Sequence, residues 1–183
     1  MKMSNEEIED VIWGKDVDSF NRFPTFLNLA PRLKGKSYWY ALRNSYDTSD
    51  NLFHYGSMVK AAFLKAEPGR QFLMLKEERA YLKKLPDRIT IYRGMTEKEL
   101  NQKSFGVSWT LKKEMAEFFA YTYQRNVATN HLKKTVHEMT INKSEVIAFM
   151  NGRKEFEIIY INAPVQADYD KMKFFNARTI SKN

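Results

Sequence analysis

The sequence predicts an α+β fold, in which an N-terminal helical region precedes a strand-rich core. Apolar residues recur at helical spacing up to about residue 85, and short β-branched and aromatic runs follow from residue 89 onward. One clear helix interrupts these strands, which disfavours a regular βαβ arrangement and favours a compact antiparallel or mixed α+β domain. We therefore expect a helical region, 1–85, that packs on a core, 86–183.

The bulk composition narrows the class of protein. The 183 residues fit one domain or one domain with a small appendage, and 43% of them are hydrophobic, which is enough for a packed core. The absence of cysteine excludes a disulfide scaffold, a thiolate zinc site and a cysteine nucleophile. The net charge of +8 favours anionic partners such as nucleic acid, a nucleotide or an acidic protein, although solvated lysines explain it equally well.

The start of the chain has no targeting signal that we recognise. Its first residues are polar and acidic, and no apolar stretch approaches the roughly 20 residues that cross a bilayer. We therefore expect a protein that stays in a cytoplasm and has no membrane partner.

The helical region is expected to contain three helices. The first begins in the stretch Ser4-Asn5-Glu6-Glu7, which offers polar N-cap candidates and acids for the first turn. The second covers about 48–66 and the third about 69–84, in which residues 76–79 are expected to face water. Two prolines are expected to break the helical pattern between the first and second helices: Pro24 and Pro31.

The core is expected to alternate strands with one helix. Strands are predicted at 89–92 and 105–110, followed by a helix at 112–123. The polar stretch 124–130 is expected to be a mobile loop. Three further strands are predicted at about 134–141, 145–149 and 156–162.

The first candidate site residue is an arginine at the end of a strand. In Tyr92-Arg93-Gly94, the guanidinium can make a forked contact with phosphate oxygens, and the glycine lets the backbone approach a ligand closely. Taken alone, the pattern is also that of a surface arginine at a strand end.

The second candidate is the triplet Ser108-Trp109-Thr110. Strand alternation places both hydroxyls on one face, where they can line a polar pocket and orient a carboxylate. An ordinary edge strand with Trp109 in the core has the same pattern.

The third candidate is the triplet Glu155-Phe156-Glu157, which leads into an apolar run. Alternation predicts both carboxylates on one face, where like charges raise each other's proton affinity and suit acid–base or cation-stabilising chemistry. A solvated strand start beside Arg153 and Lys154 is the alternative.

In this order, the three motifs resemble the arginine–serine–glutamate class of mono-ADP-ribosyltransferases, which includes bacterial toxins, phage enzymes and vertebrate ecto-enzymes. The resemblance runs from about Ile89 to Ile161 and is densest from Glu138 to Tyr160. The middle motif departs from the commoner Ser-Thr-Ser, so Ser108 matches the family better than the second hydroxyl does. The resemblance implies a core of two small packed sheets, mixed or antiparallel, around a cleft that binds NAD.

The resemblance also implies a role for each matching residue. Arg93 would hold the NAD phosphates, and the backbone of Gly94 would lie near the nicotinamide. Ser108 would position Glu157, and Thr110 would be a further member of the NAD site. Glu157 would stabilise the oxocarbenium ion that forms when the nicotinamide–ribose bond breaks.

Glu155 and Phe119 complete the implied site. Phe119 would stack on the nicotinamide, unless it belongs to the core, where helix aromatics at this spacing usually lie. In the family, a glutamate at the position of Glu155 accompanies arginine acceptors, and a carboxylate can orient a guanidinium and assist its deprotonation. The loop 151–154 would face the target protein.

The implied activity is an NAD-dependent protein ADP-ribosyltransferase, for which NAD is a substrate. Its partner would be a host or cellular protein with an acceptor arginine, and the basic surface also suits a nucleic-acid-associated target. By analogy with toxin and phage enzymes, we expect a phage- or bacterium-encoded effector that acts in the host cytoplasm. No metal is expected, because His131 and His137 do not pair with a third ligand at metal-binding spacing.

Two other functions stay open. With water as the acceptor, the same fold would be an NAD glycohydrolase. The basic and aromatic stretch 34–40 instead suggests a nucleic-acid-binding module, in which rings stack on bases and lysines contact phosphates, unless these rings build the N-terminal core. Residues 1–85 match no family, and would either pack against the NAD cleft or recognise the target.

Overall fold

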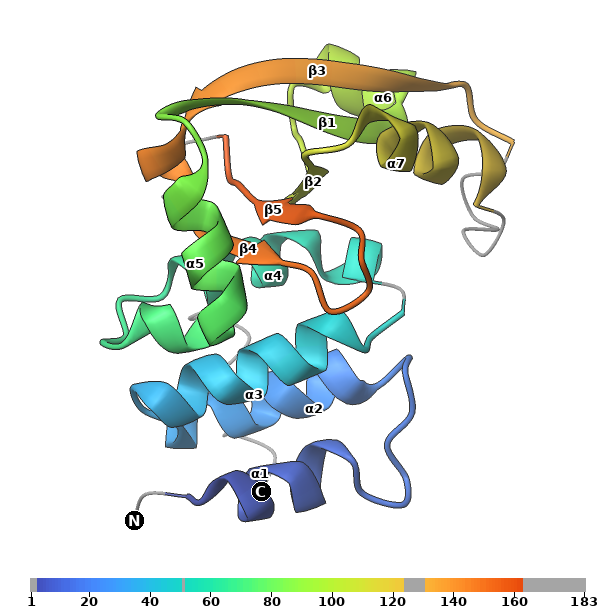
Figure 1. The fold of residues 1–183 in the computed structure, drawn as a ribbon. Coiled ribbons are helices and arrows are strands. Elements are labelled where there is room, and N and C mark those ends of the chain that lie inside the picture. Colours follow the sequence, from blue (N-terminus) through green and yellow to red (C-terminus); the bar gives the residue numbers. More distant parts are fainter. Residues whose placement is uncertain (1–2, 51, 124–130, 163–183) are drawn as a thin grey trace. The chain divides into compact units, whose positions relative to one another are not determined.

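The computed structural model describes residues 3–50, 52–123 and 131–162, and the chain divides into two compact units between Leu73 and Met74 (Figure 1). This division falls earlier than the expected boundary after residue 85. The reason is that helix α5 (Lys76–Lys84) packs against strand β4 (Ala148–Met150) and so belongs to the second unit. None of the helices in the described ranges is long and apolar enough to cross a membrane.

The described part of the first unit is helical. The helix start predicted at residues 4–7 is present, and Ser4 is its N-cap: the Ser4 hydroxyl accepts from the Glu7 N–H at 3.1 Å, and the Glu7 carboxylate accepts from the Ser4 N–H at 2.7 Å. The prolines do not prevent helix formation, because Pro24 lies in the first turn of α2, where an N–H has no intrahelical partner. The helices are α1 (Asn5–Ile12), α2 (Arg22–Leu29), η1 (Ala30–Arg32), α3 (Lys36–Asp47), η2 (Leu52–Tyr55), α4 (Gly56–Leu64) and η3 (Arg70–Leu73).

The basic and aromatic stretch 34–40 contributes to the core of the first unit. Tyr38 and Trp39 are 1% and 0% exposed. The Tyr38 hydroxyl donates to the carbonyl of Ala62 at 2.8 Å, and the Trp39 indole N–H donates to the carbonyl of Pro68 at 3.0 Å. These two rings are therefore packed and hydrogen-bonded inside the protein, where they cannot stack on nucleic-acid bases.

The second unit contains one five-stranded antiparallel sheet, with strand order β3-β1-β2-β5-β4. Both helices and strands are present, as the predicted fold class requires, but the described strands form one sheet where two were expected. Strands β1 and β3 pair over nine residue pairs, whereas β1 and β2 meet only at Tyr92 and Thr110, so the sheet narrows at its centre. Its strands are β1 (Arg88–Thr96), β2 (Ser108–Thr110), β3 (Lys134–Asn142), β4 (Ala148–Met150) and β5 (Glu157–Ile159).

Short helices accompany this sheet. The helix predicted at 112–123 is present as α7 (Lys113–Glu117), which continues into a π-helical turn, η4 (Phe118–Thr122), and both pack against β1. Helix α6 (Glu97–Gln102) was not predicted. The expected loop 124–130 lies outside the described residues.

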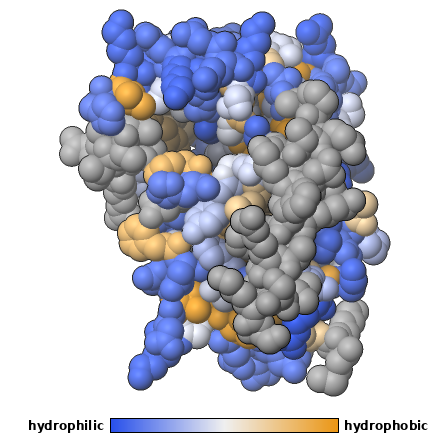
Figure 2. Space-filling model, turned by 180° about the vertical axis from the view of Figure 1, so that it is seen from behind, coloured by the Kyte–Doolittle hydropathy of each residue, from blue (hydrophilic) through white to orange (hydrophobic). Residues whose placement is uncertain are grey.

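The core of the second unit is aromatic and aliphatic. Trp109 is 2% exposed and packs edge-on against Phe105, with ring centroids 5.6 Å apart. On the face of the molecule seen in Figure 2, hydrophilic residues cover most of the described surface and hydrophobic residues form smaller patches. Two of the exposed large hydrophobic side chains of this unit, Phe118 and Tyr121, belong to η4.

Candidate functional site

The residues of the three sequence motifs lie on adjacent strands of the second unit. Arg93 is on β1, Ser108 and Thr110 are on β2, and Glu157 begins β5. In the sheet, β2 lies between β1 and β5. The fold therefore gathers motifs that are far apart in the sequence.

Thr110 is the direct cross-strand neighbour of Glu157. Their Cα atoms are paired in the register of β2 and β5, and they are 6% and 4% exposed. Ser108 pairs instead with Ile159, two residues further along β5. The sequence favoured Ser108 as the residue that positions Glu157, but the register makes Thr110 the nearer partner and leaves Ser108 on the diagonal.

Arg93 ties β1 to β2 and to helix α6. Its Nε donates to Glu99 Oε1 at 2.8 Å, and its Nη1 donates to the carbonyl of Ser108 at 2.6 Å. The same Glu99 oxygen accepts from the N–H of Gly106 at 2.9 Å, and a Cβ at Gly106 would overlap Nη2 of Arg93. The guanidinium is thus fixed in place, and it carries more N–H donors than these two contacts use.

Glu99 was missed in the sequence, although a signal was present. Thr96 and Glu99 stand at the spacing of a capping box, and the Thr96 hydroxyl does accept from the Glu99 N–H at 3.1 Å. In a full capping box, the glutamate would turn back to the N-cap backbone. Here its carboxylate contacts Arg93 instead, so the capping pattern predicts the start of α6 but not the ion pair.

Gly94 is required by the close approach of α7 and η4 to β1. A Cβ at this position would overlap the carbonyl of Ala116 and lie 2.8 Å from the backbone nitrogen of Ala120. Phe119, the residue before Ala120, is half-buried in an aromatic cluster, 5.5 Å from Phe118 and 5.3 Å from Tyr123 between ring centroids. The π-helical turn that carries it is a feature often found at functional sites.

The triplet Glu155-Phe156-Glu157 is not a continuous strand, because β5 begins only at Glu157. Phe156 and Lys154 adopt left-handed backbone angles, with φ of 53° and 60°. Such a conformation costs a residue with a Cβ about 1–2 kcal/mol. The strand alternation from which the sequence placed both carboxylates on one face therefore does not apply.

The two carboxylates nevertheless contact a common group. Nη2 of Arg153 lies 2.9 Å from Oε2 of Glu155 and 3.8 Å from Oε2 of Glu157. The Glu157 side chain is 5% exposed, and that of Glu155 is 21% exposed. Both acids therefore lie within reach of one guanidinium, although the backbone between them turns.

Several contacts hold the strained turn at Phe156. The side-chain oxygen of Asn151 accepts from the Phe156 N–H at 3.0 Å, and the Leu111 N–H donates to the Phe156 carbonyl at 3.1 Å. The ammonium group of Lys112 lies 3.8 Å from the centre of the Phe156 ring. The Thr110 hydroxyl donates to the carbonyl of Glu155 at 2.7 Å, which links this turn to β2.

Helix α5 supports the same loop. Its residue Glu78 is 5% exposed, and its carboxylate accepts from the N–H of Asn151 at 2.8 Å and from that of Leu75 at 2.7 Å. One turn further on, Tyr81 stacks on Phe149 of β4, with ring centroids 4.6 Å apart. The sequence expected Glu78 to face water, and that expectation was wrong because this acid is needed to bind two backbone N–H groups.

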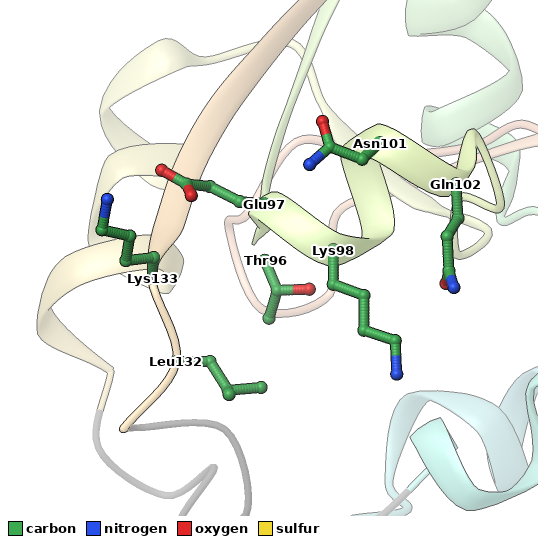
Figure 3. A pocket seen from close by; sticks show the side chains of 7 residues that line it. All are labelled: Thr96, Glu97, Lys98, Asn101, Gln102, Leu132 and Lys133. Atoms are coloured by element: carbon green, nitrogen blue, oxygen red, sulfur yellow. The ribbon is translucent and has the colours of Figure 1, made fainter.

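A cavity of about 380 Å³ lies elsewhere in the second unit (Figure 3). It is bounded by Thr96, α6 and the two residues before β3, and Figure 3 shows the side chains of Glu97 and Lys133 on the same side of it. Its lining residues include none of the motif residues: Thr96, Glu97, Lys98, Asn101, Gln102, Leu132 and Lys133. Within the described ranges, no group of three or more His, Asp or Glu residues is arranged to hold a metal ion.

Comparisons of the chain with protein-family models, with curated proteins and with solved structures find no match. The chemistry of the residues around β1, β2 and β5 is therefore the basis for a functional proposal. The register places Tyr92, Thr110 and Glu157 in one row across these strands, and Arg93, the next residue of β1, donates to the Ser108 carbonyl of β2.

Proposed function

We propose that the second unit binds NAD and transfers its ADP-ribose to an arginine of another protein. The observation that carries this proposal is the convergence of three ordered motifs on neighbouring strands. Thr110 and Glu157 are paired across β2 and β5. The Arg93 guanidinium donates a hydrogen bond to the carbonyl of Ser108, which lies on the same strand as Thr110. An ADP-ribosyltransferase needs this set of groups together: a cation for the phosphates and a fixed carboxylate for the ribose.

Glu157 is proposed to act on the bond between nicotinamide and ribose. As this bond breaks, positive charge develops on the ribose, and a carboxylate held in advance stabilises that charge without reorganisation. Glu157 is buried in the sheet, where its charge is screened less than it would be in water. Its neighbour Thr110 also holds the carbonyl of Glu155, so one threonine supports both acids.

Arg93 is proposed to bind the phosphates of NAD. Its contacts with Glu99 and Ser108 fix the orientation of the guanidinium, which reduces the entropy lost when a ligand binds. The absence of a side chain at Gly106 leaves the space that Nη2 of Arg93 occupies. A phosphate would then contact N–H donors that the protein contacts do not use.

Glu155 is proposed to select arginine as the acceptor. The contact of Arg153 with Glu155 and Glu157 supports this choice, because a guanidinium already lies against both carboxylates. A carboxylate at this distance can orient a guanidinium by paired hydrogen bonds and accept its proton during transfer.

Release of nicotinamide and transfer of labelled ADP-ribose test the proposal together. Purified protein, labelled NAD and a cell lysate should give a labelled protein band and free nicotinamide. Glu157→Gln should lower both rates by a factor of a hundred or more, in line with the roughly 10²–10³-fold cost of removing one stabilising group. Glu138→Gln, which changes an exposed strand glutamate of β3, should leave both rates unchanged.

A second variant separates transfer from hydrolysis. Glu155→Gln should abolish labelling of the acceptor while nicotinamide release persists. If the wild type releases nicotinamide but labels no protein, and Glu155→Gln does not alter that release, the protein is an NAD glycohydrolase. If the wild type neither binds NAD nor releases nicotinamide, the proposed function is wrong.

A further inference from the structure

The helix that follows β2 presents one face to the sheet and the other to solvent. On the inner face, the buried Ala116 and Ala120 lie against Gly94 of β1. The outer face carries two acids and two aromatic rings, all of them exposed: Glu114 and Glu117 of α7, and Phe118 and Tyr121 of η4. Because residues three and four apart are neighbours on a helix surface, these four side chains form one continuous row, here called the α7–η4 stripe.

The two rings of the stripe are exposed although they are large. Phe118 is 42% exposed, and Tyr121 is 64% exposed. Phe118 packs on one side against Phe119 and Tyr123, with ring centroids 5.5 and 5.9 Å apart, so it is held in place by other rings. Adjacent exposed rings of this kind mark an interaction surface, whereas scattered single ones do not.

The two carboxylates of the stripe indicate the charge of what it binds. The whole chain carries a net charge of +8, so two acids on one exposed face give this face a charge opposite to that of the molecule. Lys113 flanks the stripe, with Nζ 4.0 Å from Oε1 of Glu117, but an ion pair as exposed as this one is weak and a cationic ligand can replace it. A guanidinium suits both halves of the stripe, because it stacks on aromatic rings and makes forked hydrogen bonds with carboxylates.

The stripe begins beside the proposed site. Lys112, two residues before Glu114, has its ammonium group 3.8 Å from the centre of the Phe156 ring, and Phe156 lies between the two glutamates of the site. At 1.5 Å of rise per residue, the stripe spans about 11 Å along the helix. Roughly three or four residues of extended chain cover that length. A short segment of another protein can therefore lie along the stripe, next to the turn at Phe156.

We propose that the α7–η4 stripe docks a basic segment of the acceptor protein, in which an arginine stacks on the exposed rings and pairs with the acids. This inference rests on the proposed function, because it names the part of the partner that is recognised. The docked arginine is not the one that is modified: it binds the helix, whereas the acceptor arginine reaches Glu155. Targets are therefore segments that carry more than one arginine close together.

Binding of a synthetic peptide of alternating arginine and serine residues, measured by fluorescence anisotropy without NAD, tests the inference. The wild type should bind this peptide. Phe118→Ala and Tyr121→Ala should each raise its Kd about two- to fivefold, which corresponds to the loss of one exposed cation–π contact. The double variant Glu114→Gln, Glu117→Gln should also raise the Kd, and the Kd should then depend less on salt concentration than that of the wild type.

Two control variants change similar side chains elsewhere. Phe20→Ala removes an exposed ring of the first unit, and Glu138→Gln neutralises an exposed acid of β3. Both should bind the arginine peptide like the wild type. If the variants of the stripe bind as tightly as these controls, the inference is overturned.

Two further peptides identify the group that is recognised. With lysine in place of arginine, binding should be several-fold weaker, because an ammonium group neither stacks as a plane nor makes a forked contact. With citrulline, the neutral analogue of arginine, binding should be lost. Equal binding of the lysine and arginine peptides would overturn the inference. A dimer in sedimentation that Tyr121→Ala dissociates would make a second copy of the chain the occupant, and would overturn it as well.

Transfer of labelled ADP-ribose to the arginine peptide separates failure of this inference from failure of the proposed function. Tyr121→Ala should raise the KM for the peptide with a smaller change in kcat. If the peptide is labelled with the same KM by the wild type and by Tyr121→Ala, docking on the stripe is overturned and the proposed function stands. If the peptide binds as predicted but no nicotinamide is released, the stripe remains a docking surface for basic segments and the proposed function falls.

Discussion

Thr110 lies directly opposite Glu157 across strands β2 and β5, and both residues are buried. The Thr110 hydroxyl donates to the carbonyl of Glu155 and accepts from the N–H of Lys112 at 3.1 Å. The Thr110 side chain therefore links β2 to the turn before β5, and the Thr110 backbone pairs with Glu157, the first residue of β5.

A substitution of Thr110 tests how much its two side-chain hydrogen bonds contribute to stability. Thr110→Val keeps the shape but leaves the Glu155 carbonyl and the Lys112 N–H without this partner, which should lower the free energy of unfolding by about 1–3 kcal/mol. Urea denaturation measures the loss. The matched control is Thr90→Val, because Thr90 is more exposed and only approaches the Thr140 hydroxyl, at 3.4 Å. Equal losses in the two variants would contradict this account.

Gly94 should tolerate no side chain. Gly94→Ala would force its Cβ against the backbone of Ala116 and Ala120, and overpacking of this kind lowers the free energy of unfolding by about 1–3 kcal/mol or more. The control is Gly56→Ala at the first residue of α4, where a Cβ meets nothing within 4 Å, so the free energy of unfolding should not fall. Thermal melts compare the two. A stable Gly94→Ala protein would mean that η4 does not pack against β1 as described.

Asn151 should affect the rate of nicotinamide release, because its side chain holds the backbone of Phe156 between the two glutamates. Asn151→Ala removes the acceptor of the Phe156 N–H, so the strained turn should relax and move both carboxylates. We expect kcat for nicotinamide release to fall about tenfold, a barrier change of about 1.4 kcal/mol, with a smaller change in the KM for NAD. Steady-state kinetics measure both.

Asn151→Asp provides the rescue for this prediction. It keeps a side-chain oxygen that accepts from the Phe156 N–H, so most of the activity should return. Asn101→Ala, which changes an exposed asparagine of α6, serves as the unaffected comparison. If Asn151→Asp is as impaired as Asn151→Ala, the hydrogen bond to Phe156 is not the cause.

The first unit should lose stability in acid partly through Glu67. Burial raises the pKa of the Glu67 carboxyl, but the Gly35 N–H at 2.9 Å and the ammonium groups of Lys65 and Lys34 lower it more, so the pKa lies below its ordinary value of 4.5. A carboxyl whose folded-state pKa is lowered contributes stability above the unfolded-state pKa and loses it as the pH falls through the folded-state pKa.

Glu67→Gln reveals this contribution. At pH 7 the variant should have a lower free energy of unfolding than the wild type. This difference between the two free energies should narrow as the pH falls below about 4.5. Urea denaturation at a series of pH values from 7 to 3 measures it. A difference that stays constant over this range would show that the charge of Glu67 is not responsible.

The elements that the sequence predicted best are those that local patterns determine. Ser4 caps α1 because its side chain and Glu7 satisfy neighbouring N–H groups, and β1 and β3 follow β-branched runs bounded by turns. The placement of Arg93, Ser108 and Glu157 on adjacent strands depends on strand order, which no local pattern contains.

The details of the site that sequence reasoning missed depend on backbone geometry. Alternation assumes an extended strand, and the left-handed Phe156 breaks that assumption just before Glu157. The register of β2 against β5 decides that Thr110, rather than Ser108, faces Glu157. Glu78 carries the charge pattern of a solvated helix face, and only the fold brings the N–H of Asn151 to it.

The structure of the Glu157→Gln variant with NAD bound tests the central proposal most directly, because the substitution should slow cleavage enough to retain the nucleotide. The account predicts the nicotinamide ribose beside position 157 and Thr110, and the phosphates within hydrogen-bonding distance of Arg93. Phosphates bound away from Arg93, with the ribose out of reach of positions 155 and 157, would contradict it.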